Sequence, residues 1–318
     1  RLALFLALLL LGTSQAVAAP KSVAVKKLSL IAVNQGAEKL VISGKTLITV
    51  GNTDGINSNI LLTGLDSNGV QLWQKTIDSG VDEVALAATT DPSGNIWLAG
   101  ASSAIVSSDT ATAPIQAENP DGVLVEPVTK LRGDMNVLTL WKVSPVGDVI
   151  ATYSASQSAP ALINAISANA SGVSLVGSLQ EKPFIQSVTA QGVFGKLISI
   201  GTSKSSLNAI VRQSDGTLSV FGTSAETLGG KKLAGIRDGI LIKISKTGAV
   251  ASAVRSSAPK ADRSWIGADS TLALTGFVKT GKVIESAFTK FTSAFAPSWT
   301  LRVPSLGTSA LISAGTTT

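Results

Sequence analysis

Carboxylates, hydroxyls and basic side chains are the groups in this chain that could do chemistry, because it contains neither cysteine nor histidine. Ser-His and Cys-His nucleophile pairs are therefore excluded, as are disulfides and metal sites built from those ligands. Paired carboxylates, which can cleave glycosidic bonds, remain available among 20 Asp and Glu residues. Several carboxylates instead fall in predicted hairpin turns, where they would bind backbone amides: Asp54, Asp66, Asp91, Asp215 and Asp238.

Short motifs that resemble functional ones are explained by their context. Ser43-Gly44-Lys45-Thr46 matches the end of a phosphate-binding loop, but the full pattern needs Gly where Lys39 stands. Ser257-Ala258-Pro259-Lys260 has the spacing of a serine acyl-transfer motif, yet its proline opposes the required helix. Arg132-Gly133-Asp134, an integrin-binding tripeptide, and the oxygen-rich stretch 52–59 are predicted to be turns. We predict no cofactor and no metal.

The elements that position these residues repeat along the chain. Short apolar runs ending in Gly occur at 47–51, 96–100, 173–177, 218–222 and 272–276. Their period of about 45 residues, with one long insertion, is typical of a four-stranded propeller blade. Strand, Gly-bearing turn and strand follow in each unit, which predicts hairpins with tight two-residue turns. No apolar stripe at helical spacing extends beyond two turns, so we predict an all-β fold.

The repeats predict a β-propeller of four-stranded antiparallel blades. Five complete blades are expected at 38–76, 83–153, 162–200, 207–254 and 264–303, and a partial sixth begins at 308–312. Residues 27–36 match the fourth strand and following residues at 71–80 and are predicted to complete a final blade, which would remove exposed sheet edges. We therefore expect a propeller domain at 19–318, truncated at its C-terminus, from a ring of six or more blades.

The first residues have the layout of a secretory signal peptide. Arg1 precedes an apolar run at 2–11, and Ala16-Val17-Ala18 provides a small-x-small cleavage site. The apolar run is too short to cross about 30 Å of hydrocarbon. We predict that residues 1–18 are removed, that the mature fragment has no transmembrane segment, and that it is secreted or extracytoplasmic. Anchoring to the cell surface through a missing C-terminus remains open.

The stretch 82–100 consists of an apolar strand, the turn Asp91-Pro92-Ser93-Gly94-Asn95 and a strand ending in Gly100. It resembles units of the bacterial β-propeller repeat family (SBBP-like), and 169–172 and 214–216 are partial matches. The resemblance spans about residues 27–315 and implies a secreted propeller without implying an activity. Its motifs are turn and core residues, and the fifth unit lacks the turn glycine.

The insertion at about 101–135 is the predicted contact surface, because function in such folds resides in loops held by a rigid scaffold. Its candidate ligand-contact residues are Asp109, Glu118, Asp121, Glu126 and Arg132. The alternative is a tolerated surface loop, since lengthening a loop costs little free energy. The five tryptophans are predicted to pack between blades.

These observations predict an exported binding or scaffold module at the cell surface or outside the cell. The net charge of +6 is dispersed, so nucleic acid is not an expected partner. A carbohydrate, a peptide or an anionic envelope polymer is expected, bound by a monomer. The alternative is a hydrolase or lyase that uses acidic residues in the propeller channel, which is disfavoured because no histidine can serve as base. Clustered carboxylates at one channel mouth would favour the enzyme, and a mixed or basic-rimmed groove would favour binding.

Overall fold

The computed structural model describes residues 36–53, 57–104 and 132–305, which form strands and turns. Within these ranges twenty strands make five four-stranded antiparallel sheets, and each sheet is a meander in chain order. No helix within these ranges is long and apolar enough to span a bilayer. The all-β prediction is confirmed, and the five sheets coincide with the five predicted blades.

The strands are five to nine residues long except for the short β12. In chain order they are β1 (Lys39–Ser43), β2 (Thr46–Asn52), β3 (Ile60–Leu65), β4 (Gln71–Ile77), β5 (Glu83–Thr90), β6 (Ile96–Ser102), β7 (Val137–Val143), β8 (Val149–Ser156), β9 (Ala161–Asn169), β10 (Gly172–Leu179), β11 (Lys182–Thr189), β12 (Ile198–Ser199), β13 (Ser205–Arg212), β14 (Leu218–Ser224), β15 (Asp238–Ile244), β16 (Val250–Ser256), β17 (Ala261–Ala268), β18 (Ala273–Thr280), β19 (Val283–Phe291) and β20 (Pro297–Pro304).

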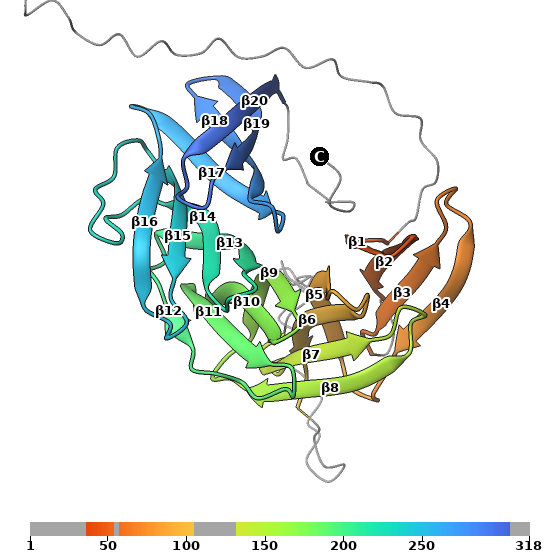
Figure 1. Cartoon of the computed structure of the whole chain (residues 1–318). Coiled ribbons are helices and arrows are strands. Elements are labelled where there is room, and N and C mark those ends of the chain that lie inside the picture. Colours follow the sequence, from red (N-terminus) through yellow and green to blue (C-terminus); the bar gives the residue numbers. More distant parts are fainter. Residues whose placement is uncertain (1–35, 54–56, 105–131, 306–318) are drawn as a thin grey trace, which may run out of the picture.

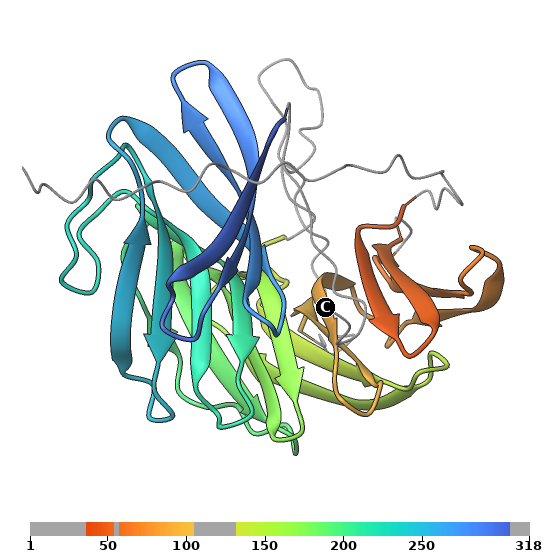
Figure 2. The same ribbon diagram turned by 45° about the horizontal axis from the view of Figure 1, so that its top comes forward.

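The five sheets follow one another around an arc, as the blades of a propeller do (Figure 1). Neighbouring sheets contact each other through their first strands, so β5, β9 and β13 lie side by side on the inside of the arc. Sheets β1–β4 and β17–β20 stand at its two ends, as the tilted view in Figure 2 also shows. The predicted signal peptide, the strand at 27–36 except its last residue, and the partial sixth blade lie outside the described residues.

In the second to fifth sheets the glycine that marks the repeat lies opposite a bulge. A Cβ atom at Gly100, Gly177 or Gly222 would come within 1.8, 2.0 or 1.9 Å of a carbonyl oxygen of the preceding strand. At the same place the register of the first strand shifts by one residue in the second to fifth sheets. A side chain there would collide with the bulged strand, so the repeat has a steric origin.

Asparagines in two of these bulges join neighbouring sheets. The amide of Asn164 donates to the carbonyl of Leu207 at 2.8 Å, and that of Asn208 donates to the carbonyl of Trp265 at 3.0 Å. Buried carbonyls need such partners, and each bond crosses from one inner strand to the next. The bulges therefore fix the position of one blade relative to its neighbour.

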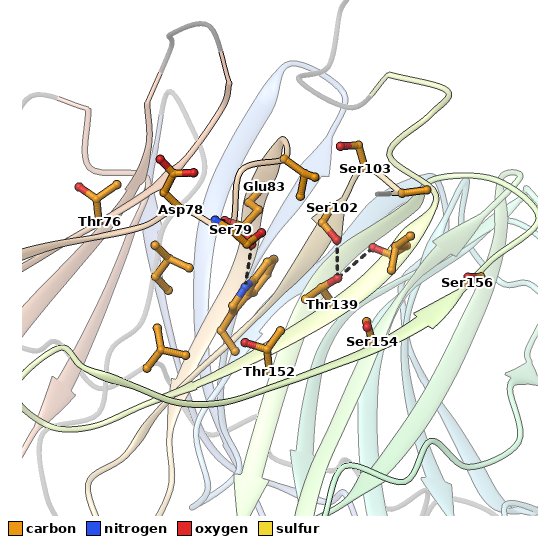
Figure 3. Close-up of a pocket in the computed structure, with 16 residues that line it drawn as sticks. Thr76, Asp78, Ser79, Glu83, Ser102, Ser103, Thr139, Thr152, Ser154 and Ser156 are labelled. Carbon is orange, nitrogen blue, oxygen red and sulfur yellow. Dashed lines mark hydrogen bonds between the residues drawn. The ribbon is translucent and has the colours of Figure 1, made fainter. Parts of the chain in front are cut away.

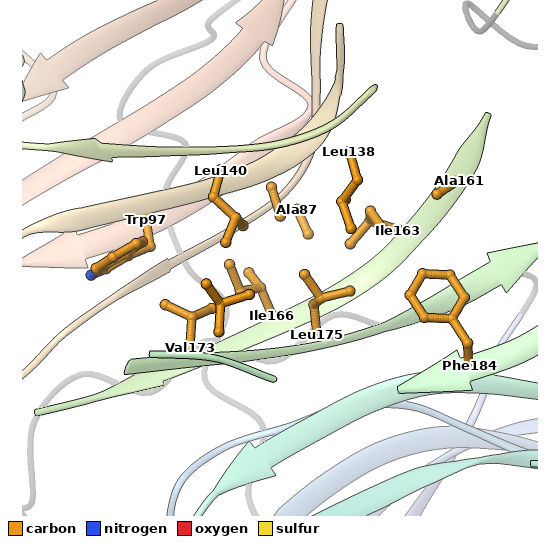
Figure 4. Close-up of a cluster of buried hydrophobic side chains, with 12 residues drawn as sticks. Ala87, Trp97, Leu138, Leu140, Ala161, Ile163, Ile166, Val173, Leu175 and Phe184 are labelled. Atoms are coloured by element: carbon orange, nitrogen blue, oxygen red, sulfur yellow. The ribbon is translucent and has the colours of Figure 1, made fainter. Parts of the chain in front are cut away.

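Apolar side chains fill the space between adjacent sheets. Figure 4 shows Trp97 and Leu140 of the second sheet meeting Val173 and Leu175 of the third. Trp97, Trp141 and Trp265 are at most 2% exposed, which confirms their predicted packing. The prediction is wrong for Trp299, which lies on the outer strand β20 and is 52% exposed.

Among the described hairpins, the predicted two-residue turn is found at 44–45, 170–171, 180–181 and 281–282, and the other turns are longer. In the turn after β5, the amide of Asp91 donates to the carbonyl of Asn95, and the amide of Gly94 donates back to Asp91. Gly94 has a φ of +81°, as expected for a type I turn followed by a left-handed residue. In the fifth blade Leu272 and Phe295 occupy this position at φ of +63° and +61°.

Candidate functional site

A pocket of about 660 Å³ lies where the first sheet meets the second (Figure 3). Its walls come from the end of β4, the start of β5, the end of β6 and one side of β7 and β8. Ten of the lining side chains are polar: Thr76, Asp78, Ser79, Glu83, Ser102, Ser103, Thr139, Thr152, Ser154 and Ser156. The others are Trp141 and five aliphatic residues, so none of the described lining residues is cationic.

Strand alternation produces this polar wall. On β7, Thr139 faces the pocket, whereas Leu138 and Leu140 on the opposite side belong to the core shared with the third sheet. On β8, Thr152 and Ser154 line the pocket, and Tyr153 between them stacks on Trp97 at 6.1 Å on the other side. The core therefore fixes which side chains face the pocket.

Glu83 supplies a buried negative charge at the pocket. It is 2% exposed, and its Oε1 accepts hydrogen bonds from Ser79 Oγ at 2.8 Å and Trp141 Nε1 at 3.3 Å. Its Oε2 accepts the amide of Ser79 at 3.1 Å. Within the described chain it forms no salt bridge. Its carboxylate is thus held by neutral donors, which fix its position without neutralising its charge.

Some of the other polar side chains that line the pocket already form hydrogen bonds within the protein, and others do not. Asp78 accepts the amide of Gly80 at 2.9 Å, and the hydroxyls of Ser102 and Thr139 bond to each other at 2.8 Å. The exposed hydroxyls of Thr152, Ser154 and Ser156 hydrogen-bond to no other described residue. One wall of the pocket therefore presents hydroxyls ready for a ligand.

Arg132, one of the candidate residues, lies outside this lining and is held by ion pairs. Its Nη2 is 2.5 Å from Asp82 Oδ2 and 2.8 Å from Asp134 Oδ2, and the hydrogen bonds that it donates to Asp134 and Asp82 raise its pKa. Asp82 also accepts the amide of Ser58 at 2.7 Å. Arg132 thus ties together the loops after β2, β4 and β6. The other candidates, Asp109, Glu118, Asp121 and Glu126, lie outside the described residues.

The short motifs lie in turns and loops as predicted. Gly44, with a φ of +59°, forms the turn between β1 and β2, Gly133 and Asp134 form the turn before β7, and Pro259 lies in the loop between β16 and β17. Asp54 and part of the stretch 52–59 lie outside the described residues. No group of three or more acidic residues that could hold a metal occurs in the part of the chain that the structure describes.

Asp238 corrects one turn prediction. It is the first residue of β15 rather than a turn residue, and it is completely buried. Its carboxylate pairs with Arg255 at 3.0 Å and accepts the amides of Ala234 and Gly235. Asp66, Asp91 and Asp215 do lie in turns and accept backbone amides there.

The pocket residues were not identified from the sequence. Two signals were present: Glu83 is a charge at the start of an otherwise apolar strand, and hydroxyls alternate along 152–156. Neither signal shows that β5, which begins with Glu83, and β8, which carries the hydroxyls, line the same pocket. That depends on how the first and second sheets separate toward their outer strands β4 and β8, away from the inside of the arc.

Comparisons with known proteins add little to this description. No family model matches the chain, and no curated protein matches it. Similar solved structures include a protein of unknown function from Bacteroides caccae, with 9% identity, a TM-score of 0.49, and coverage of 85% of this chain and 84% of that one. A periplasmic gluconolactonase from Pseudomonas aeruginosa has 12% identity, a TM-score of 0.48, and coverage of 85% and 72%.

The WD40 domain of a Toxoplasma gondii coronin has 12% identity, a TM-score of 0.44, and coverage of 86% and 60%. None of these likenesses bears on activity. The five meander sheets themselves, packed through their first strands, identify the chain as an all-β protein built from propeller blades.

Proposed function

We propose that this chain is an exported β-propeller that binds a neutral polyhydroxylated ligand, a carbohydrate, in the pocket between β4 and sheet β5–β8. The observation that carries the proposal is the combination of unengaged hydroxyls on β8 with the buried carboxylate of Glu83. A few convergent polar groups in a concave, partly aliphatic site are the usual basis of small-molecule recognition.

Hydrogen-bond chemistry favours sugar hydroxyls over other groups. The hydroxyls of Thr152, Ser154 and Ser156 can each donate and accept, as sugar hydroxyls do, whereas the carboxyl oxygens of Glu83 and Asp78 act as acceptors. Aliphatic lining residues such as Val137 and Val149 offer contacts to C–H groups. An anionic polymer would meet two carboxylates and no cation among the described lining residues, so charge disfavours it.

The proposal includes export of the protein and its relation to the bacterial β-propeller repeat family. The layout of residues 1–18 supports export, and the resemblance of 82–100 to bacterial propeller repeats supports a secreted binding module. The ligand would then be met at the cell surface or outside the cell.

Binding to neutral oligosaccharides tests the proposal. Hexamers of maltose, cellulose, xylan and chitin type are titrated calorimetrically into the protein, and at least one is expected to bind. The double substitution Thr152→Val with Ser154→Ala should weaken that binding at least tenfold, because it removes two hydroxyls from an exposed wall without touching the core.

Ser252→Ala is the matched control, since Ser252 is exposed on β16, the corresponding outer strand of the fourth sheet. Absence of binding to every hexamer, or equal binding by the double variant and wild type, would overturn the proposal. Binding of a peptide or of an anionic polymer alone would reassign the ligand class.

A hydrolase or lyase is the second candidate, and one observation favours it: Asp78 and Glu83 line the same pocket. Carboxylate pairs that flank a glycosidic bond can cleave it. The test is release of reducing ends from the same hexamers. Turnover that both Glu83→Gln and Asp78→Asn abolish would establish the enzyme, and binding without turnover would exclude cleavage of these substrates.

A further inference from the structure

The junction between the fourth and fifth sheets contains an arginine without an acidic partner. Arg263, on β17, donates through Nη1 to the hydroxyl of Ser256 and lies 5.4 Å from the ring centroid of Trp265. Among the described residues, no carboxylate oxygen lies within 4.0 Å of its nitrogens. Partly buried charges are normally paired, so this guanidinium is unusual.

Two buried donors at the same place also lack acceptors. The Nε of Arg263 and the Nε1 of Trp265 are buried and have no hydrogen-bond partner among the described residues. Both side chains pack against Gly239, where a Cβ would lie 3.2 Å from Arg263 Cγ and 2.7 Å from Trp265 Nε1. Buried donors left unsatisfied are costly, and most native ones have a partner.

The surrounding charges leave this region positive. Arg302 lies on β20 and is half-exposed. It pairs with Ala287 on β19, which pairs with Gly276 on β18, which in turn pairs with Trp265 on β17, so Arg302 and Trp265 lie in one row across the sheet. The contact of Arg302 with Glu285 is long, at 3.4 Å. Burial and the charge of Arg302 lower the pKa of Arg263 to about 10, against the opposing effect of Glu285.

The other carboxylates near this junction are already paired with other arginines. Asp262 accepts two hydrogen bonds from Arg237, at 2.9 and 2.6 Å, and Asp238 is paired with Arg255. Glu285 pairs with Arg302, so among the described residues Arg263 has no counterion of its own.

We propose that Arg263 and Arg302 form a binding site for one oxyanion, a carboxylate or phosphate group of a ligand, at the junction of sheets β13–β16 and β17–β20. The Nη2 of Arg263 donates to no described acceptor, and the half-exposed Arg302 can contribute a second guanidinium. Guanidinium groups bind these oxyanions through paired hydrogen bonds. This site is separate from the hydroxyl-lined pocket and of opposite charge.

Thermal unfolding of the whole chain at constant ionic strength tests the site, with sodium phosphate or sodium acetate replacing sodium chloride. We expect an increase in Tm of several degrees with the oxyanion that fits, because a ligand that binds only the folded state raises its stability. A response to phosphate alone would identify a phosphate ester as the ligand group, and a response to acetate alone would identify a carboxylate.

Arg302→Gln should abolish this shift and weaken calorimetric binding of the same anion at least tenfold. Lys279→Gln is the matched control, since it removes the same charge from an exposed position on β18 of the same sheet. Arg263→Gln should also lose the response, while the Thr152→Val and Ser154→Ala variant should keep it. No shift with either anion, or equal responses from Arg302→Gln and Lys279→Gln, would overturn the proposal.

Discussion

Replacing Asp238 is expected to destabilise the fourth blade strongly. Asp238 is 0% exposed, and its partner Arg255 has a side chain only 8% exposed. Its carboxylate also accepts the hydroxyl of Ser257 and the amides of Ala234 and Gly235, at 2.9 and 2.8 Å. Asp238→Ala would leave a buried arginine and two backbone amides without this acceptor.

The magnitude follows from the cost of breaking a buried pair. Removing one partner of such a pair costs about 3–5 kcal/mol, because the remaining charge stays desolvated. Arg255 retains acceptors in the carbonyls of Lys231 and Glu226, so we expect a loss near the lower end, about 3 kcal/mol. In the double variant Asp238→Ala with Arg255→Met the loss should be smaller than the sum of the single losses.

Urea unfolding followed by tryptophan fluorescence measures this loss. Asp66→Ala is the control, since Asp66 also accepts two backbone amides, of Asn68 and Val70, but in a surface turn. We expect about 1 kcal/mol there. A loss of less than about 1 kcal/mol for Asp238→Ala would refute the reasoning.

The dependence on pH supplies a second check. Burial alone would raise the pKa of Asp238, but hydrogen bonds from Ser257, Ala234 and Gly235 and the charge of Arg255 outweigh it, and the pKa is lowered. The carboxylate therefore stabilises the fold fully above the unfolded-state pKa of about 3.9, and this contribution is lost as the pH falls through the lower folded-state pKa. The difference between wild type and Asp238→Ala should shrink in that acidic range. A difference that stays constant to pH 2 would contradict this account.

Three further substitutions test the packing. Gly100→Ala should lower stability by more than about 3 kcal/mol in urea unfolding, because its Cβ would collide with a carbonyl 1.8 Å away; a loss below about 1 kcal/mol would contradict the bulge. Asn208→Ala should cost about 1–2 kcal/mol by the same measurement, since it removes the bridge to the fifth sheet; no change would mean that water replaces it. Asp148→Asn should change Tm by less than about 2 °C, because its salt bridge to Lys75 is exposed, and a larger fall would show that this pair is structural.

The sequence predicts the blades well because their signals are local. The repeated glycine needs only its own strand and the preceding one, so Gly100 and Gly177 show the blade repeat without tertiary information. The turn glycines are equally local: Gly44 and Gly281 lie in two-residue turns as predicted, whereas the turn that contains Gly94 is longer. In such cases one residue and its nearest strand decide the structure.

The candidate pocket could not be predicted from local sequence signals, because it depends on contacts between sheets. Thr152 resembles any hydroxyl on an exposed edge strand until the separation of β4 from β8 makes it a pocket wall. Asp238 has the sequence context of a turn residue, yet Arg255 on the next strand places it in the interior. The role of a polar residue was fixed by its partner across a strand or a sheet, which spacing along the chain does not reveal.

In the second to fifth sheets the bulge divides the repeat into an invariant and a variable position. The glycine is fixed by sterics, but the extra residue opposite it is free to differ: it is Leu86, Asn164, Asn208 and Ile266 in successive sheets. Where it is asparagine it bonds to the next sheet, and Leu86 packs into the core between the second and third sheets. In the second, third and fourth sheets the extra residue is thus a connector between blades, apolar in one contact and hydrogen-bonding in the other two.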